Sequence, residues 1–172
     1  MDLTREQKLV WLAAFIDGEG HISASIYRQT QMTGRRHQRF RPYVGFTNTD
    51  IRLVQFAVSI MIELGHRPVV HLARENRPAH HKPVYRIQLA SFKPVEDILL
   101  AIRPYLVAKG DQADTVLAMI AHRRGVLGRV GKKGYGASIE ADPWMHVEMK
   151  ALGRLNSRGL ATRKDVQPLV MN

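Results

Sequence analysis

The spacing of hydrophobic residues along the first fifty positions predicts one helix followed by a strand hairpin. Thr4 and Gln7 form a capping box, which predicts a helix from this point to about Asp17. Residues 21–29 and 40–46 each alternate apolar with polar side chains, the period of a half-buried strand. The polar residues between these two stretches predict a connecting loop, so we expect an antiparallel hairpin.

The same order of elements returns in the second part of the chain. Residues 48–50 cap a second helix. We expect its buried stripe to consist of Leu53, Phe56, Ile60 and Leu64. Strands over residues 68–74 and 84–89 form a second hairpin, and helices follow over about 95–102 and 112–123. This pattern predicts an α+β fold built from two hairpins and interspersed helices.

The composition changes after Arg124. Residues 128–136 are mostly glycine and basic, which favours a loop or linker over regular structure. Asp142 and Pro143 supply an N-cap and a first-turn proline for a helix to about Leu155, and a short helix is expected after Thr162. We therefore divide the chain into a core at 1–124 and a segment at 125–172, in which the Gly/basic loop leads to C-terminal helices packed on the core.

The charge of the chain points to a polyanionic partner. Its 172 residues contain 26 Lys and Arg against 15 Asp and Glu, which gives a formal charge of +11. The longest apolar run, residues 9–16, is too short to cross a bilayer, and the N-terminal residues do not resemble a signal peptide. We expect a cytoplasmic protein with no membrane partner. The absence of cysteine excludes thiolate metal sites and Cys nucleophiles.

The segment at residues 12–20, Leu-Ala-Ala-Phe-Ile-Asp-Gly-Glu-Gly, places two carboxylates at the C-terminal end of an apolar helix. Acids there oppose the helix dipole at a cost of roughly 0.3 to 1 kcal/mol each, which a divalent cation would offset. The small pair Ala13 and Ala14 would let another helix approach closely. The alternative interpretation is an ordinary buried helix that ends in a solvated acidic turn.

This segment resembles the signature motif of the LAGLIDADG homing endonucleases. The residues identical to the motif are Leu12, Ala13, Ile16, Asp17 and Gly20. The order helix, hairpin, helix, hairpin, helix extends the resemblance to about residue 124. It implies the αββαββα fold of that family, in which an antiparallel sheet with helices on one face forms a saddle in the DNA major groove. The motif helices of that family pack at the centre of a dimer or pseudo-dimer.

The resemblance also implies roles for individual residues. Glu19 keeps the carboxylate that binds the catalytic metal, together with the backbone carbonyl of Gly18. Asn48 matches a polar residue that orders water near the scissile phosphate, and Arg52 a supporting basic residue. Lys109 matches a lysine that stabilises charge on the phosphate or tunes the attacking water. The alternatives are a helix cap for Asn48 and solvated surface for Arg52 and Lys109.

The implied function is site-specific cleavage of both strands of a long, nearly palindromic DNA target by phosphodiester hydrolysis, leaving short 3′ overhangs. Mg²⁺, or another divalent cation such as Mn²⁺, would be the cofactor. One motif copy implies a homodimer in which two Glu19 carboxylates converge. An intron-encoded enzyme is expected, acting in the cytoplasm or in the compartment that holds its host gene.

Alternation within the strands assigns a DNA-binding face independently of the family. Side chains next to buried ones in sequence point to the opposite face. We expect Phe40, Val44 and Phe46 to face the core on the first hairpin, and Tyr85, Ile87 and Leu89 on the second. Val84 is then expected on the outer face. The polar outer face contains Ser23, Ser25, Tyr27, Gln29, Arg39, Arg41, Tyr43, His71, Arg86 and Gln88. Arg and Gln pair with base edges in the major groove, whereas the alternative is a merely solvated sheet.

Two other functions compete with the endonuclease. An RNA maturase on the same fold would bind an intron RNA without cutting, although the presence of Glu19 and Lys109 argues against lost cleavage. Since both activities can coexist, intron RNA stays a possible additional partner. A non-catalytic DNA-binding regulator is the second alternative, and no helix-turn-helix pattern after Asp142 supports it.

Overall fold

A computed structural model describes residues 3–30, 36–73, 82–130, 139 and 142–157. The described elements are α1 (Arg5–Glu19), β1 (Gly20–Thr30), β2 (Arg36–Asn48), α2 (Ile51–Glu63), β3 (Val69–Ala73), β4 (Val84–Ala90), α3 (Phe92–Ile102), the 3-10 turn η1 (Arg103–Tyr105), α4 (Gly110–Val130) and α5 (Pro143–Ser157). No helix within these residues is both long and apolar enough to span a membrane.

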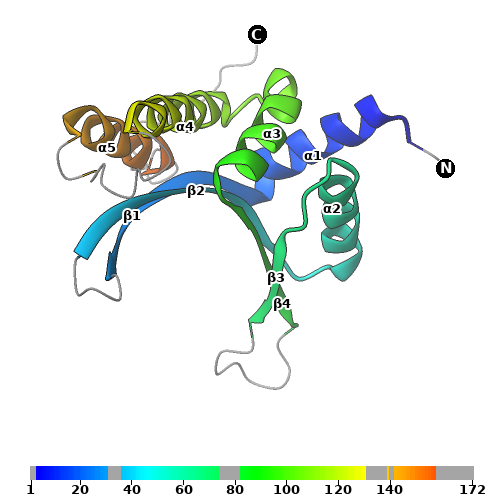
Figure 1. Cartoon of the computed structure of the whole chain (residues 1–172). Helices are drawn as coiled ribbons and strands as arrows, with labels where there is room; N and C mark the ends of the chain where they lie inside the picture. Colours follow the sequence, from blue (N-terminus) through cyan, green and yellow to red (C-terminus); the bar gives the residue numbers. More distant parts are fainter. Residues whose placement is uncertain (1–2, 31–35, 74–81, 131–138, 140–141, 158–172) are drawn as a thin grey trace, which may run out of the picture.

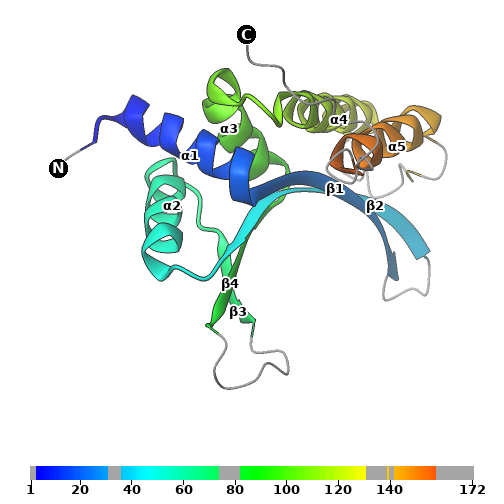
Figure 2. The same cartoon turned by 180° about the vertical axis from the view of Figure 1, so that it is seen from behind.

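The four strands form one antiparallel sheet in the order β1-β2-β4-β3. The sheet is bent into an arch, the described helices lie on its convex side, and the concave side is open (Figures 1 and 2). The predicted α+β saddle with helices on one face is therefore confirmed. The long, strongly twisted hairpin of β1 and β2 forms one limb of this arch, and the short hairpin of β3 and β4 forms the other.

The hydrophobic core lies between the sheet and the helices. Ile22, Val44 and Phe46 face it from the sheet, and Leu12 and Ile16 face them from α1, all with no exposed surface. Burial of such side chains contributes about 1.5–3 kcal/mol each. Because the inward-facing residues follow period two on β1 and β2, the alternation that we inferred for the first hairpin is confirmed.

Helix α1 begins with the predicted capping box, in which Thr4 and Gln7 each bond the other's backbone. It ends at Glu19, two residues beyond the predicted end, and continues directly into β1 without a loop. Gly20 makes this junction possible: a Cβ there would lie 2.8 Å from the backbone of Ile16. The chain therefore turns from helix to strand immediately after Glu19.

The stripe predicted for α2 is wrong in part. The buried residues of this helix are Val54, Ala57, Ile60 and Met61. Leu53 is 37% exposed, and Phe56 and Leu64 are only partly buried. The N-cap is Asp50, whose side chain accepts a hydrogen bond from the backbone of Arg52. Several apolar residues in succession made two faces of this helix look equally suitable for burial, and packing on the sheet selected the other one.

Val84 is a second correction, since it is 7% exposed although we expected it outside. It is the first residue of β4 and pairs with Ala73 of β3. The period of two fixes the side of the sheet, but burial also depends on what covers that side. The three residues of β4 that we predicted to face the core agree better: Ile87 and Leu89 are buried and Tyr85 is half-buried.

Helix α4 extends to Val130, past the predicted end at Arg123, so residues 128–130 are helical and not a loop. Its glycines weaken a helix by about 1 kcal/mol each relative to alanine without breaking it, and α4 is supported by packing against α5 and β1. Asp142 caps α5 as expected, accepting from the backbone N–H of Met145 at 3.3 Å. The helix expected after Thr162 lies outside the described residues.

Candidate active site and nucleic-acid interface

The exposed carboxylate of Glu19 lies at the junction of α1 and β1. The adjacent Gly20 pairs with Phe46, so the end of α1 and the last residues of β2 lie at the same end of the first hairpin. Gly18 is also exposed, and a Cβ added to it would meet nothing within 4 Å. An acidic side chain at a helix-to-strand junction without an intervening loop can present two oxygen ligands from a defined place on the backbone.

Lys109 reaches this junction from the far part of the chain. Its ammonium donates hydrogen bonds to the backbone carbonyl oxygens of Ile16, at 3.0 Å, and of Asp17. A positive charge there complements the negative end of the α1 dipole. We had assigned this role to a divalent cation, and in the structure Lys109 itself provides charge at the helix end. Whether Lys109 also acts on a phosphate stays a prediction.

The Asp17 side chain, which the sequence pattern showed only as one of the two carboxylates at the helix end, has a distinct set of partners in the structure. Its carboxylate accepts hydrogen bonds from the backbone N–H groups of Val107, Ala108 and Lys109, at 2.6, 3.2 and 2.9 Å. These partners lie 90 to 92 residues away in sequence, so no local pattern could have revealed them. The first motif carboxylate therefore holds the segment that bears Lys109.

His21 is a second residue of the site that the sequence analysis missed. Its half-buried ring packs edge-on against Tyr43, with ring centroids 5.6 Å apart. Burial, and then the positive charges of Arg86 and Lys109, lower the pKa of the His21 imidazole. The alternation over residues 21–29 puts His21 on the same face as Ser23, so this signal could have found it.

Gly45 leaves the space that the His21 ring fills. A Cβ at this position would lie 2.5 Å from the carbonyl oxygen of Ile87 and 2.9 Å from the imidazole. We expect Gly45→Ala to lower the free energy of unfolding by about 1–3 kcal/mol, because the close contact is with backbone that cannot move aside. Gly125→Ala, in open space on α4, is the control and is expected to stabilise by up to about 1 kcal/mol. Urea unfolding of both variants measures the difference, and an unchanged midpoint for Gly45→Ala would contradict this packing.

Asn48 and Arg52 both have local partners in the structure. The Asn48 side chain accepts a hydrogen bond from the backbone of Asp50 at 2.8 Å, so it supports the turn into α2. Arg52 forms a two-pronged ion pair with Asp50, at 3.0 and 2.5 Å, with its side chain 85% exposed. Hydrogen bonds from Arg52 lower the pKa of Asp50 to about 2. These contacts are those of a turn residue and a surface ion pair, and the catalytic roles of Asn48 and Arg52 stay predictions.

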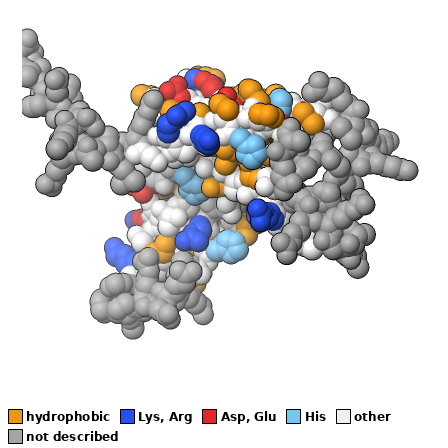
Figure 3. All heavy atoms as spheres, turned by 90° about the vertical axis from the view of Figure 1, so that its left-hand side faces the viewer, with side chains coloured by type: hydrophobic (Ala, Val, Ile, Leu, Met, Phe, Trp, Pro, Cys, Tyr) orange, Lys and Arg blue, Asp and Glu red, His pale blue; other side chains and the backbone are white. Residues whose placement is uncertain are grey.

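The concave face of the sheet carries most of the predicted DNA-binding residues. The strand register places nine of the ten predicted residues on the face opposite the core, and each of the nine is exposed or half-buried. They are Ser23, Ser25, Tyr27, Arg39, Arg41, Tyr43, His71, Arg86 and Gln88. The Gln29 side chain lies outside the described residues. Ser23 also contacts the Asn156 amide of α5 at 3.3 Å. Figure 3 views the molecule from the left-hand side of Figure 1. Lys, Arg and His side chains are visible on this side, and acidic side chains lie mainly along the upper edge of the view.

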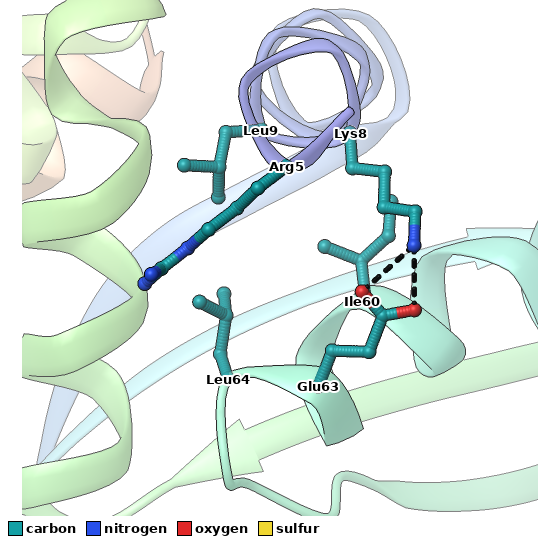
Figure 4. Close-up of a pocket in the computed structure, with 6 residues that line it drawn as sticks. All are labelled: Arg5, Lys8, Leu9, Ile60, Glu63 and Leu64. Atoms are coloured by element: carbon teal, nitrogen blue, oxygen red, sulfur yellow. Dashed lines mark hydrogen bonds and ion pairs between the residues drawn. The ribbon is translucent and has the colours of Figure 1, made fainter. Parts of the chain in front are cut away.

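A separate pocket lies between α1 and α2, toward the other end of α1 from Glu19. It is lined by Arg5, Lys8, Leu9, Ile60, Glu63 and Leu64. Lys8 and Glu63 face each other across it and form an ion pair at 2.8 Å (Figure 4). Within the described residues, no group of three or more His, Cys, Asp or Glu side chains is arranged to hold a metal ion, here or elsewhere.

This chain is similar to known proteins in its structure and not detectably in its sequence. No family model and no curated protein matches the sequence. The homing endonuclease I-CvuI in complex with its target matches with a TM-score of 0.59 and 18% identity, over 88% of this chain and 83% of that one. The archaeal intron-encoded homing endonuclease I-Vdi141I, complexed with DNA, matches with a TM-score of 0.63 and 15% identity, over 88% and 86%. The chain has the LAGLIDADG homing endonuclease fold.

The LAGLIDADG fold occurs in longer chains as well. The meganuclease I-SmaMI, bound to uncleavable DNA, matches with a TM-score of 0.56 and 15% identity over 84% of this chain, but only 42% of the I-SmaMI chain. One copy of the present chain thus corresponds to less than half of that protein. The fold predicted from the residue pattern and the motif is confirmed, and it is a fold of DNA endonucleases.

Proposed function

We propose that this chain is a site-specific endonuclease that hydrolyses both strands of a long, nearly palindromic DNA target. The observation that carries the proposal is the exposed Glu19 carboxylate at the α1–β1 junction, beside Lys109 and at the edge of an arched sheet that carries Arg and Gln on its open face. Solved homing endonucleases with this fold include complexes with DNA. The formal charge of +11 favours the same partner.

The donor atoms at the junction suit a hard divalent cation. Glu19 offers a carboxylate and Gly18 a backbone carbonyl, both oxygen ligands of the kind that Mg²⁺ and Mn²⁺ prefer. A small number of protein ligands leaves positions for water and for a phosphate oxygen. A cation bound there would polarise the phosphate and lower the pKa of a bound water. Structures of I-CvuI were solved in the presence of Ca or Mg, which supports this cofactor class.

We propose further that two copies assemble through α1. Val10, Ala14 and Gly18 form an exposed row at four-residue spacing along one side of this helix. Ala13, which we had expected to share this face, is fully buried within its own chain. Close packing of two such rows would bring both Glu19 carboxylates to the dimer axis, one for each strand. The match to less than half of the I-SmaMI chain is consistent with two copies forming the functional unit.

The open face of the sheet is expected to read base pairs. Arg41 is exposed on β2 and Arg86 on β4, and both side chains point away from the core. We expect Arg41→Ala and Arg86→Ala each to lose about 1–3 kcal/mol of discrimination at one base pair of each half-site. Sequencing of targets selected from a randomised pool would measure this. Arg5→Ala, which removes an exposed charge from the first turn of α1, is the control, and an unchanged site preference in both sheet variants would contradict the face assignment.

The proposed function is tested by incubating the purified chain with a randomised pool of symmetric DNA targets and Mg²⁺, and sequencing the ends. We expect double-strand breaks with short 3′ overhangs at one family of sites, lost on addition of chelator. Binding of symmetric sites without any cutting, with Mg²⁺ or Mn²⁺, would favour a DNA-binding regulator. We propose that the chain is encoded in an intron, as is I-Vdi141I, and binding to the intron RNA would identify an added maturase role.

A further inference from the structure

We infer that Asp17 is a positioning residue for DNA cleavage: it holds the 107–109 segment, and with it Lys109, against the helix end that carries Gly18 and Glu19. The inference rests on the proposed function, since it gives Asp17 a task in the same site. It differs from a metal-ligand role, because the contacts of the Asp17 carboxylate within the described part of the chain are with backbone N–H groups.

The contact between Asp17 and Lys109 runs in two directions. The carboxylate of Asp17 accepts from three successive N–H groups, and the ammonium of Lys109 donates back to the carbonyl oxygens of Ile16 and Asp17. The carboxylate and the ammonium are not bonded to each other. Each group instead satisfies backbone atoms of the opposite segment, which fixes the position of one segment on the other. We call this pair of contacts the Asp17–Lys109 latch.

The latch complements two helix ends at once. The C-terminal carbonyls of α1 receive the positive charge of Lys109. Lys109 immediately precedes α4, where its own carbonyl accepts the first helical bond from Ala113 at 3.1 Å, so the Asp17 carboxylate lies at the positive end of α4. A positive charge at the C-terminal end of α1 and a negative charge at the N-terminal end of α4 are both stabilising. The latch therefore couples the end of α1 to the start of α4.

Side-chain packing gives this segment little other support. Val107 is 93% exposed and Ala108 is also exposed. Leu106, just before them, is buried and anchors the N-terminal side of the 107–109 segment. Without the Asp17 carboxylate, the backbone at 107–109 would lose its recorded bonds to α1, and Lys109 would gain freedom. A lysine has four rotatable side-chain bonds, so a fixed backbone is needed for its ammonium to hold one place.

The variant Asp17→Asn tests whether Asp17 acts through its two carboxylate oxygens or only through the volume of its side chain. Oδ1 accepts from Lys109 and Oδ2 from Val107 and Ala108, so both oxygens are needed as acceptors. An asparagine has only one such oxygen, and its amide group would face an N–H donor. The variant keeps the volume of the side chain and loses at least one side of the latch.

The test is a double-mutant cycle on cleavage of the selected target under single-turnover conditions. We expect Asp17→Asn to slow cleavage on the order of tenfold to a hundredfold, as removal of an orienting residue behind a site commonly does, with unchanged DNA affinity in Ca²⁺. Lys109→Met should slow it at least as much. Adding Asp17→Asn to Lys109→Met should then have almost no further effect, because the positioned group is gone. If the two substitutions slow cleavage independently, so that their separate fold-changes multiply in the double variant, the inference is overturned.

A second readout needs neither DNA nor metal. Hydrogen exchange at the amides of residues 107–109 should become faster in Asp17→Asn, while β2 keeps its protection. Unchanged exchange there would mean that the latch does not hold this segment and would overturn the inference. If the amides respond but the parent chain cuts no DNA, the proposed function fails, and the cleavage role of Asp17 fails with it while the structural contact stands. Should Asp17→Asn fail to fold, Asp17→Glu replaces it in the same cycle, because its extra methylene group shifts both carboxylate oxygens away from the three N–H groups.

Discussion

Ala14→Arg is expected to convert the dimer to a monomer and to abolish double-strand cleavage. Ala14 is exposed in the middle of the row that also contains Val10 and Gly18, so an arginine there would meet its own copy across the dimer axis. The added bulk prevents close approach of the two helices, and like charges brought together cost several kcal/mol. We expect the dimer dissociation constant to rise by about two orders of magnitude or more.

Sedimentation of the free protein, together with cleavage of the selected target, measures both effects. Ala121→Arg makes the same change at an exposed position of α4, away from α1, and should leave assembly and cleavage unchanged. Because Ala14 packs against little within its own chain, the thermal midpoint of the isolated fold should not fall enough to explain the loss. A dimer of parental stability carrying Ala14→Arg would rule out α1 as the interface.

Strand periodicity predicted the faces of the sheet well, because the geometry that determines it is local. Side chains on a strand alternate by covalent necessity, so once Ile22 and Val44 are inside, Ser23 and Tyr43 must be outside. The capping box of α1 was predictable for the same reason, since both of its partners lie within four residues. The motif then placed Glu19 at a helix end before any tertiary contact was known.

Contacts between distant segments could not be predicted in this way. The bonds from Asp17 to the 107–109 segment depend on how α1, η1 and α4 meet, and no sequence spacing encodes that. The buried face of α2 and the length of α4 were also misjudged. In both cases packing overrode local preference: several apolar residues on α2 could have faced the core, and α4 continues through two glycines.

Glu19→Gln is expected to reduce cleavage below detection, a loss of at least three orders of magnitude if the carboxylate is the metal ligand that we propose. Glutamine keeps the size of the side chain and removes the negative charge that would hold the cation. DNA binding should be retained, because the proposed contacts come from the open sheet face, and in the absence of metal it should be slightly tighter. Since Glu19 is exposed at the end of α1, the change should not lower stability.

Glu6→Gln is the matched control, since it makes the same substitution in an exposed residue at the other end of the same helix. It should cleave, bind and assemble like the parent chain. Loss of assembly and binding together with cleavage in Glu19→Gln would assign Glu19 a structural role instead.

The most direct test of a metal-dependent cut made through Glu19 is to follow binding and cleavage of one labelled target by the parent chain and by Glu19→Gln, with Mg²⁺ and with chelator. We predict that both proteins shift the DNA to a similar extent, and that only the parent chain, only with Mg²⁺, produces fragments with short 3′ overhangs. Cleavage by Glu19→Gln at near the parental rate, or cleavage by the parent chain that persists in chelator, would contradict the account.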